Sequence, residues 1–398
     1  MISVEEALKI VQANPHSTAV VELPLMASVG KILAENILAD RDFPPFNRVA
    51  MDGLAFCFEK IDFQKITIEN IQFAGEAQKT LQDASKGIEV MTGAILPLGC
   101  DTVVRYEDIN IQQDGEVKFA SISIAKEEIV KGQNVHVQGS DRHAGEVLLQ
   151  KGIKISPAEI AVMASVGKSK VQVQSTPKIA IISTGDELVE IDKTPLAYQI
   201  RTSNAYMLSA ALQQIGVEAS TFHLIDEEKV LYQKLKEIIA TYDILLLSGG
   251  VSAGKKDFVP AILADLGLEK LFHKVAQKPG KPMWFGKTPT GKIIFALPGN
   301  PVSTFLCFCK YVLPTLKSES KHEEVILDKD IIFKPDLTYF VPVKTYFEAG
   351  KMMAKPFLGS GSADFANLTD CDGFVELPAQ KQIFKAGEVF SFVRFRGL

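Results

Sequence analysis

The run Asp243-Ile-Leu-Leu-Leu247, followed by Ser248-Gly249-Gly250-Val251-Ser252-Ala253-Gly254, decides the fold of this chain. A short apolar run that ends in a glycine-rich loop is typical of a strand buried on both faces of a parallel sheet. The same pattern occurs at 178–183, and helical periodicity occupies 205–215 and 227–240. Strands that alternate with helices predict right-handed crossovers, and therefore a central three-layer α/β/α domain over 177–325 with a mostly parallel sheet.

Outside this domain the texture of the sequence changes. Residues 49–144 consist of short β-rich runs separated by Gly and Asp-Gly, which predicts a small inserted β-rich domain. The insert divides an elongated N-terminal domain formed by 1–48 and 145–176. Residues 326–398 return to short strands and predict a small C-terminal β domain. The expected fold class is therefore α/β multidomain.

The bulk composition narrows the function classes without naming a reaction. The 398 residues include 43 Lys+Arg and 48 Asp+Glu, and the net charge of −5 argues against a broadly basic nucleic-acid surface. No apolar stretch approaches the roughly 18 residues of a membrane span. Five cysteines without CxxC spacing argue against a disulfide framework or a zinc site. We expect a cytoplasmic protein with no nucleic-acid and no membrane partner.

In an open α/β sheet, ligands bind beyond the carboxyl ends of the strands. Here the loop 248–250 can cradle a phosphate, because glycine lets an anion approach the main chain, although such a loop can equally be a plain turn. The carboxylates of Glu187, Asp226 and Asp257 are expected to converge around it, and hard oxygen ligands beside a phosphate suit Mg²⁺. Of Asp186 and Glu187, we expect Glu187 to face the site while Asp186 caps the next segment.

Two lysines flank a stiff turn in Gln277-Lys278-Pro279-Gly280-Lys281-Pro282. Lysine is a compact point charge that suits a phosphate or a tetrahedral oxyanion, and the prolines and glycine limit how far these lysines can relax. The segment Leu297-Pro298-Gly299-Asn300-Pro301-Val302-Ser303 then ends a strand and opens a helix, which places Ser303 in a first turn that favours anions. Together these groups predict a phosphoanhydride or oxyanion-transfer site.

Other signals indicate packing. Cys307 and Cys309 lie in an apolar helical stretch and are expected in the core or lining a groove, and the six histidines lack metal-ligand spacing. The sequence has no Walker A and no GxGxxG motif, which argues against an ATP-hydrolysing P-loop and against a nicotinamide dehydrogenase.

In this order, the motifs resemble the molybdopterin molybdenumtransferase family of the MoeA type, which is related to the E domain of gephyrin. Upstream, Pro44-Pro45-Phe46 before Ala50-Met51-Asp52-Gly53 resembles a Pro-Pro-Phe and Ala-Met-Asp-Gly element of that family. Met91-Thr92-Gly93-Ala94 also fits, as do Gly132-Gln133-Asn134 and Gly139-Ser140-Asp141. The resemblance covers the chain from residue 1 to 398.

The resemblance implies insertion of molybdate into the dithiolene of adenylyl-molybdopterin with release of AMP, dependent on Mg²⁺. It also implies a homodimer, in which an Asp of the inserted domain faces the partner's site, and a molybdopterin adenylyltransferase is a candidate further partner. The expected catalytic residues are Asp52, Thr92, Asp141, Glu187, Asp226, Asp257, Lys278 and Lys281, with Glu187, Asp226 and Asp257 as metal ligands. The expected substrate-binding residues are Thr184, Gly185, Ser248, Gly249, Gly250, Val251, Ser252, Pro298, Gly299, Asn300, Pro301, Ser303 and Ser362.

The chain departs from the family pattern at a few positions. Asn47-Arg48-Val49 stands where the family usually has an Asp and a small residue before the Ala, and His136 stands where an Arg is expected. Lys344 is the basic candidate where some relatives have an Arg in the last domain. Two alternative functions stay open: molybdopterin adenylyl transfer, which a related Gly-Gly fold performs, and a gephyrin-like scaffold.

Overall fold

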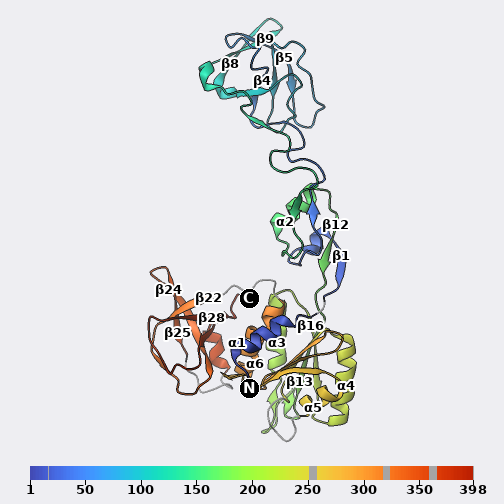
Figure 1. Ribbon diagram of the computed structural model, residues 1–398, viewed down its shortest axis with the longest axis vertical. Coiled ribbons are helices and arrows are strands. Elements are labelled where there is room, and N and C mark those ends of the chain that lie inside the picture. Colours follow the sequence, from blue (N-terminus) through green and yellow to red (C-terminus); the bar gives the residue numbers. More distant parts are fainter. Residues whose placement is uncertain (17, 251–257, 317–322, 358–364, 398) are drawn as a thin grey trace. The chain divides into compact units, whose positions relative to one another are not determined.

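The computed structural model describes residues 1–398 except 17, 251–257, 317–322, 358–364 and 398 (Figure 1). The chain forms two compact units, one of Glu22–Val173 and the other of Met1–Val21 together with Gln174–Leu398. Among the helices described, none combines the length and the apolar character that crossing a bilayer requires.

The larger unit contains the α/β domain that the alternating strands and helices predict. Its sheet has the order β16-β13-β17-β21-β20-β18. Of these six strands five run in the same direction and β20 is reversed, so the sheet is mostly parallel, as expected. The strands are β13 (Ile179–Thr184), β16 (Ala219–Leu224), β17 (Ile244–Ser248), β18 (Glu269–His273), β20 (Trp284–Lys287) and β21 (Ile293–Leu297).

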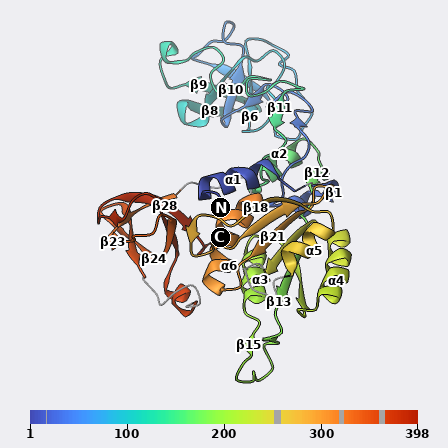
Figure 2. The same cartoon turned by 60° about the horizontal axis from the view of Figure 1, so that its bottom comes forward.

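Helices cover both faces of this sheet (Figure 2). On one face, α4 (Glu228–Thr241) and α5 (Val259–Asp265) bury Leu231, Leu235 and Ile262 against the strands. On the other face lie α1 (Val4–Ala13), α3 (Asn204–Gln214) and α6 (Pro301–Cys307). Two apolar clusters, one on each face, confirm the three-layer architecture.

The first helix groups with the α/β domain. Ser3 caps α1 by accepting a hydrogen bond from the backbone N–H of Glu6 (3.1 Å), and the buried Val4, Ala7 and Val11 repeat at helical spacing. These three residues join the core on the α3 and α6 face. Residues 1–21 therefore belong to the larger unit, although the sequence assigns them to the N-terminal domain 1–48.

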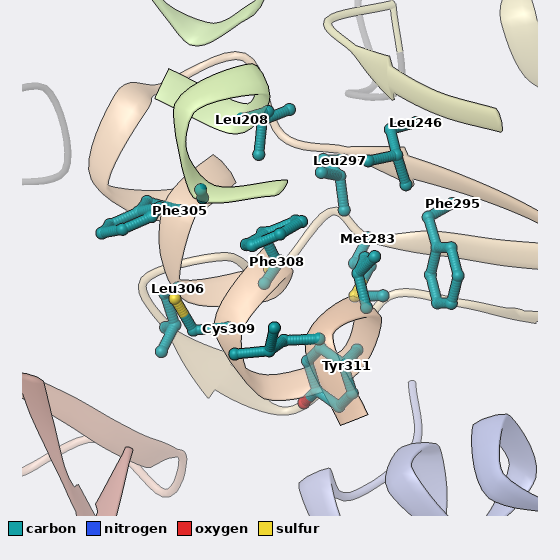
Figure 3. Close-up of a cluster of buried hydrophobic side chains, with 14 of the residues drawn as sticks. Leu208, Leu246, Met283, Phe295, Leu297, Phe305, Leu306, Phe308, Cys309 and Tyr311 are labelled. Carbon is teal, nitrogen blue, oxygen red and sulfur yellow. The ribbon is translucent and has the colours of Figure 1, made fainter. Parts of the chain in front are cut away.

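Beyond α6 the chain continues helically through a π turn, Phe308–Val312, into α7 (Leu313–Leu316). Figure 3 shows how this helical segment packs with α3 and the sheet, where Leu208, Leu297 and Phe308 approach one another. Cys309 and Tyr311 lie in the same cluster, and Cys307 and Cys309 are both buried. The two cysteines are core residues, as the apolar helix predicts.

The C-terminal residues form a second six-stranded sheet, with the order β19-β24-β25-β22-β28-β26. It closes on itself because β24 also pairs with β26, which gives the small barrel-like C-terminal β domain. Its first strand, β19 (Gln277–Lys278), comes from the α/β domain and pairs with β24. The other strands are β22 (Glu323–Leu327), β24 (Thr338–Glu348), β25 (Lys351–Pro356), β26 (Gly373–Leu377) and β28 (Val389–Arg394), beside the pair β23 (Ile331–Ile332) and β27 (Ile383–Phe384).

The smaller unit carries the β-rich insert. Its six-stranded sheet has the order β7-β4-β6-β5-β9-β8. Leu54 and Ala55 are neighbours in one strand, yet they belong to different apolar clusters, because successive side chains point to opposite faces. The strands of the sheet are β4 (Gly53–Phe56), β5 (Ile66–Gln72), β6 (Gly87–Val90), β7 (Thr102–Arg105), β8 (Ile109–Asp114) and β9 (Val117–Ile122).

Short elements complete both units. They are β1 (Val20–Pro24), β2 (Ile37–Leu38), β3 (Arg48–Val49), β10 (Val135–His136), β11 (Val147–Leu149), α2 (Pro157–Ser165), β12 (Lys170–Gln174), β14 (Leu188–Val189), β15 (Ile200–Arg201) and the 3₁₀ turns Leu25–Ser28, Tyr106–Asp108, Lys126–Glu128 and Ala366–Asp370.

Candidate functional site

The predicted site residues of the larger unit that are described lie near one edge of its parallel sheet. The strand register pairs Ser183 with Ser248 and Ser248 with Leu297, so the segments that follow these residues leave the sheet side by side. The loop that carries Lys278 and Lys281 joins β18 to β20, and it reaches the same edge because β20 runs antiparallel to β21.

The strand order sets the order of chemical groups along this edge. Asp226 follows β16, Glu187 follows β13, Gly249 follows β17, Gly299 follows β21, and Lys281 precedes β20. Neighbouring strands lie roughly 5 Å apart, so about 15 Å separates the strand that leads to Glu187 from the strand that follows Lys281. Carboxylates therefore stand at one end of a row, lysines at the other, and glycine turns between them.

The glycine turn after β17 sits too close to its neighbours to carry side chains. The φ angles are +102° at Gly249 and +69° at Gly250, a region that favours glycine. A Cβ on Gly249 would lie 2.9 Å from the carbonyl oxygen of Thr184, and one on Gly250 would lie 2.8 Å from Val259 Cγ2. The backbone of the turn is also near the next loop, since a Cβ on Gly299 would lie 3.8 Å from Gly249 Cα.

Asn204, at the start of α3, connects three of the site segments. Its Nδ2 lies within hydrogen-bonding distance of Ser248 Oγ (2.8 Å), the Gly299 carbonyl (2.7 Å) and Thr304 Oγ1 (3.2 Å). Sequence reasoning missed this residue, because asparagine at the start of a helix is ordinary. Next to the glycine turn, the hydroxyl of Thr184 is buried and has no hydrogen-bond partner in the described part of the chain.

The two neighbouring carboxylates after β13 have different surroundings, and the prediction that Glu187 faces the site stays a prediction. Asp186 Oδ1 accepts a hydrogen bond from the backbone N–H of Asp226 (3.1 Å), so Asp186 ties the loop after β13 to the loop after β16. The Glu187 carboxylate instead folds over Gly185, where a Cβ would meet Glu187 Oε2 at 2.7 Å. His223 Nε2 lies 3.1 Å from the Gly185 carbonyl.

Four predicted site residues, Val251, Ser252, Asp257 and Ser362, lie outside the described residues. Within the described part, no group of three His, Cys, Asp or Glu side chains is arranged to hold a metal ion. Glu187 and Asp226 are thus two members of a predicted three-carboxylate set whose third member is not described, and their role as metal ligands stays a prediction.

The turn 278–281, which we call the lysine turn, is held in place by a buried polar network. Gln277, which is 1% exposed, donates from Nε2 to the carbonyls of Pro279 (3.1 Å) and Gly280 (3.3 Å), and it accepts from Tyr311 Oη (2.5 Å). A Cβ on Gly280 would lie 2.7 Å from Cys307 Sγ. Burial raises the pKa of the Cys307 thiol to about 12, and it also raises the pKa of Tyr311, so both groups stay protonated. The backbone of the lysine turn is therefore held in place by this buried network as well as by its prolines.

The two lysines have different surroundings. The Nζ of Lys278 lies 5.5 Å from the ring centre of Phe333 and 5.8 Å from that of Tyr339, and these two rings stack at 4.2 Å. A cation over aromatic faces is held by the ring quadrupole. Lys281 is exposed, and within the described residues its Nζ makes no hydrogen bond or ion pair.

The segment after β21 folds as expected. Helix α6 begins at Pro301, and Ser303 lies in its first turn. Ser303 is only 3% exposed, so its side chain packs inside the protein, whereas Asn300 is exposed. Thr304 Oγ1 donates to the Pro298 carbonyl (2.5 Å), which holds the Pro298–Asn300 turn against the helix.

In the smaller unit, Asp52 and Thr92 meet. Asp52 Oδ1 accepts from both the backbone N–H (2.6 Å) and the hydroxyl (2.7 Å) of Thr92. These two bonds hold the pKa of Asp52 below its ordinary value, and the bond from the backbone N–H has the larger effect. The Asp52 carboxylate is exposed, and its lowered pKa keeps it ionised at neutral pH.

Asp141 is contacted by His136, which in turn contacts Arg48, and both of these residues depart from the family pattern. His136 Nε2 lies 2.8 Å from Asp141 Oδ1, and His136 Nδ1 lies 3.1 Å from Arg48 Nη2. Arg48 and His136 are direct partners across β3 and β10. The bond from His136 is the main cause of a lowered pKa at Asp141.

Comparison with known proteins covers the whole chain. Residues 2–167 match the MoeA N-terminal region (domain I and II), residues 180–318 a probable molybdopterin binding domain, and residues 324–395 the MoeA C-terminal region (domain IV). A molybdopterin molybdenumtransferase of Synechocystis is 40% identical over 397 residues, which cover 98% of this chain and 99% of that protein. One of Bacillus subtilis is 30% identical over 413 residues, with 99% and 94% covered.

The fold agrees with these matches. The structure of a molybdopterin biosynthesis MoeA protein from Pyrococcus horikoshii superposes with a TM-score of 0.83 at 29% identity, and the match covers 100% of both chains. The three matched regions cover both compact units. They include the sheet-edge residues of the larger unit and Asp52, Thr92 and Asp141 of the smaller one. The chain therefore belongs to the MoeA family of molybdopterin molybdenumtransferases.

Proposed function

We propose that this protein transfers molybdenum from molybdate to the dithiolene of adenylyl-molybdopterin and releases AMP. The observation that carries the proposal is the row at the sheet edge, in which a glycine turn separates carboxylates from lysines. An adenylylated pterin dithiolene is an elongated ligand with a pyrophosphate in its middle, and such a row offers different chemistry along its length. Membership of the MoeA family supports the same assignment.

The glycine turns would receive the pyrophosphate. Gly249 and Gly299 bring bare main chain close together, and a phosphate needs that freedom from Cβ atoms to approach the backbone. Asn204 holds both segments at a fixed spacing, since it contacts the loop after β21 and the end of β17. Positioning of this kind can supply much of a barrier reduction when no protein nucleophile is used.

The lysine turn would hold molybdate, a tetrahedral dianion, beside the dithiolene sulfurs. Lys281 is the better candidate for direct contact, because Lys278 lies over the ring pair of Phe333 and Tyr339. The Gln277 network keeps the backbone of the turn from shifting, so the charge is placed before the substrate arrives.

The donor set at the opposite end fits Mg²⁺. Glu187 and Asp226 supply carboxylate oxygens, the ligands that Mg²⁺ prefers, and Asp257 would be the third. When bound, the ion would neutralise the pyrophosphate charge as the anhydride breaks. Asp186 orients this end, because its Oδ1 accepts a hydrogen bond from the backbone N–H of Asp226 and so connects the loop after β13 to the loop after β16.

The proposal is tested by incubating purified protein with adenylyl-molybdopterin, molybdate and Mg²⁺ and measuring AMP. We expect AMP release that requires both molybdate and Mg²⁺, and that falls strongly in Lys281→Ala. AMP formation that is indifferent to molybdate would contradict the proposed transfer. Consumption of ATP with unadenylylated molybdopterin would instead indicate the earlier, adenylyl-transfer reaction.

We further infer a homodimer as the working form. The residues expected at one active cleft divide between the two compact units, with Asp52, Thr92 and Asp141 in one and the sheet-edge residues in the other. The resemblance assigns the aspartates of one subunit to the site of its partner. A molybdopterin adenylyltransferase that delivers the adenylylated substrate is the proposed further partner.

A further inference from the structure

Arg48, His136 and Asp141 form a chain of contacts in the smaller unit. Arg48 and His136 stand opposite each other on the antiparallel pair β3 and β10. Arg48 Nη2 lies 3.1 Å from His136 Nδ1, and His136 Nε2 lies 2.8 Å from Asp141 Oδ1. Both ring nitrogens of one histidine are therefore used, one toward a cation and the other toward an anion.

These partners determine where the histidine carries its proton. Arginine has five N–H donors and no acceptor, so the nitrogen that meets Arg48 must offer a lone pair. His136 Nδ1 is then unprotonated, the proton sits on Nε2, and Nε2–H donates to Asp141. A second proton on Nδ1 would set a donor against the Arg48 donor and break that contact.

The geometry leaves one oxygen of Asp141 for a ligand. Oδ1 accepts from His136 and also from Ser140 Oγ (3.2 Å). Within the part of the chain that is described, Oδ2 makes no hydrogen bond, and the side chain of Asp141 is 54% exposed. Because Oδ1 accepts two hydrogen bonds, rotation of the Asp141 carboxylate is restricted, and Oδ2 points in a defined direction.

We propose that Arg48 and His136 are positioning residues for Asp141: Arg48 selects the neutral Nε2–H tautomer of His136, and His136 orients the Asp141 carboxylate. The inference rests on the proposed function only in that it takes Asp141 to belong to the molybdenum-insertion site. It also explains both departures together. The cation expected at position 136 stands here at the facing position 48, and the histidine transmits its effect to the carboxylate.

The tautomer can be observed without any substrate. In full-length protein labelled with ¹⁵N-histidine, long-range ¹H–¹⁵N spectra at pH 8 should show the His136 ring as the Nε2–H tautomer, assigned by its loss in His136→Gln. Arg48→Ala should shift the ring toward a mixture of tautomers, while Arg48→Lys, which keeps a donor, should restore most of the Nε2–H form. The proposal is overturned if the wild-type His136 ring is in the Nδ1–H or imidazolium form, or if its tautomer does not change in Arg48→Ala.

Turnover of the same samples tests the consequence for function. We expect Arg48→Ala to lower kcat/KM for AMP release about tenfold, the size expected for loss of one charge-assisted hydrogen bond, and Arg48→Lys to recover most of it. The control is Arg105→Ala, which removes another exposed arginine of this unit that pairs with a carboxylate, Asp108, and should leave turnover unchanged.

Rescue by the conservative variant separates positioning from a general loss of structure. If Arg48→Ala acts by releasing His136, Arg48→Lys should restore both the Nε2–H tautomer and kcat/KM, and the thermal unfolding temperature should differ little among the wild type and the two variants. A changed tautomer with unchanged kcat/KM overturns the positioning role. If the wild type releases no AMP, the proposed function fails, and the tautomer spectra still decide whether Arg48 controls His136.

Discussion

At Gly250 the structure depends on the absence of a single carbon atom. The residue needs a positive φ, and its missing Cβ would fall 2.8 Å from Val259 Cγ2 and 3.0 Å from Thr184 Oγ1. Gly216 has nearly the same φ, +73° against +69°, but nothing lies within 4 Å of its missing Cβ. The two glycines thus separate the cost of the backbone conformation from the cost of the close approach.

We expect Gly216→Ala to lower stability by about 1 kcal/mol, the cost of a left-handed alanine, and to leave AMP release unchanged. Gly250→Ala should cost more, about 2–3 kcal/mol, because Thr184 or Val259 must also move, and it should raise KM for adenylyl-molybdopterin. Thermal unfolding and steady-state kinetics measure both. Equal KM values for adenylyl-molybdopterin in the two variants would show that the close approach at Gly250 has no role in substrate binding.

Cys307 makes stability depend on alkaline pH. Burial raises the pKa of its thiol from 9.0 to about 12, so the folded state keeps a proton that the unfolded state releases above pH 9. The associated stability is complete below pH 9 and is lost as the pH rises toward 12, at about 1.4 kcal/mol per pH unit. We expect Cys307→Ala to reduce this slope in urea unfolding between pH 9 and 10.5. Parallel curves for the variant and the wild type would contradict the raised pKa.

At the scale of elements, the helical segment that follows α6 supports the lysine turn. Tyr311 reaches from the π turn after α6 to Gln277 in β19, and Gln277 holds the carbonyls of Pro279 and Gly280. The π turn adds one residue to a helical turn and re-aims the side chains that follow it, a feature found often at functional sites.

Tyr311→Phe should therefore loosen the turn without unfolding the domain. It leaves Gln277 Oε1 buried without its donor, at a cost of about 1–3 kcal/mol. We expect KM for molybdate to rise about tenfold while kcat changes less, because the lysines remain but lose their fixed placement. The control is Tyr346→Phe, an exposed tyrosine on β24 whose hydroxyl lies 3.5 Å from Asp328. A molybdate KM that does not respond to Tyr311→Phe would refute the supporting role.

The elements with strong periodicity could be predicted from the sequence, and contacts between distant elements could not. Apolar runs such as 243–247 predict the parallel strands, and the loops that follow them necessarily share one edge. The pairing of β19 with β24 involves two residues and carries no local pattern. Asn204 acts through partners 44, 95 and 100 residues away, which no sequence spacing indicates. Arg48 and His136 are visible in the sequence only as departures, and their contact depends on strand register.

At the scale of the whole molecule, the proposed site needs residues from both compact units. Lys281 belongs to the larger unit and Asp141 to the smaller one. If each site of a homodimer takes its lysine from one subunit and its aspartate from the partner, two inactive variants can complement each other. A heterodimer of the two variants then has one site in which both residues are intact and one site in which both are replaced.

We expect Lys281→Ala and Asp141→Ala each to be inactive alone and to recover activity when they are unfolded, mixed in equal amounts and refolded. Half of the dimers in a random mixture contain one subunit of each kind, and one of their two sites then has both residues intact, so the mixture should reach about a quarter of wild-type activity. Mixed Lys281→Ala and Lys278→Ala subunits serve as the control, because both defects fall in the same unit. A site built from one subunit cannot regain activity in heterodimers of Lys281→Ala with Asp141→Ala, because each subunit then carries one defect in its only site.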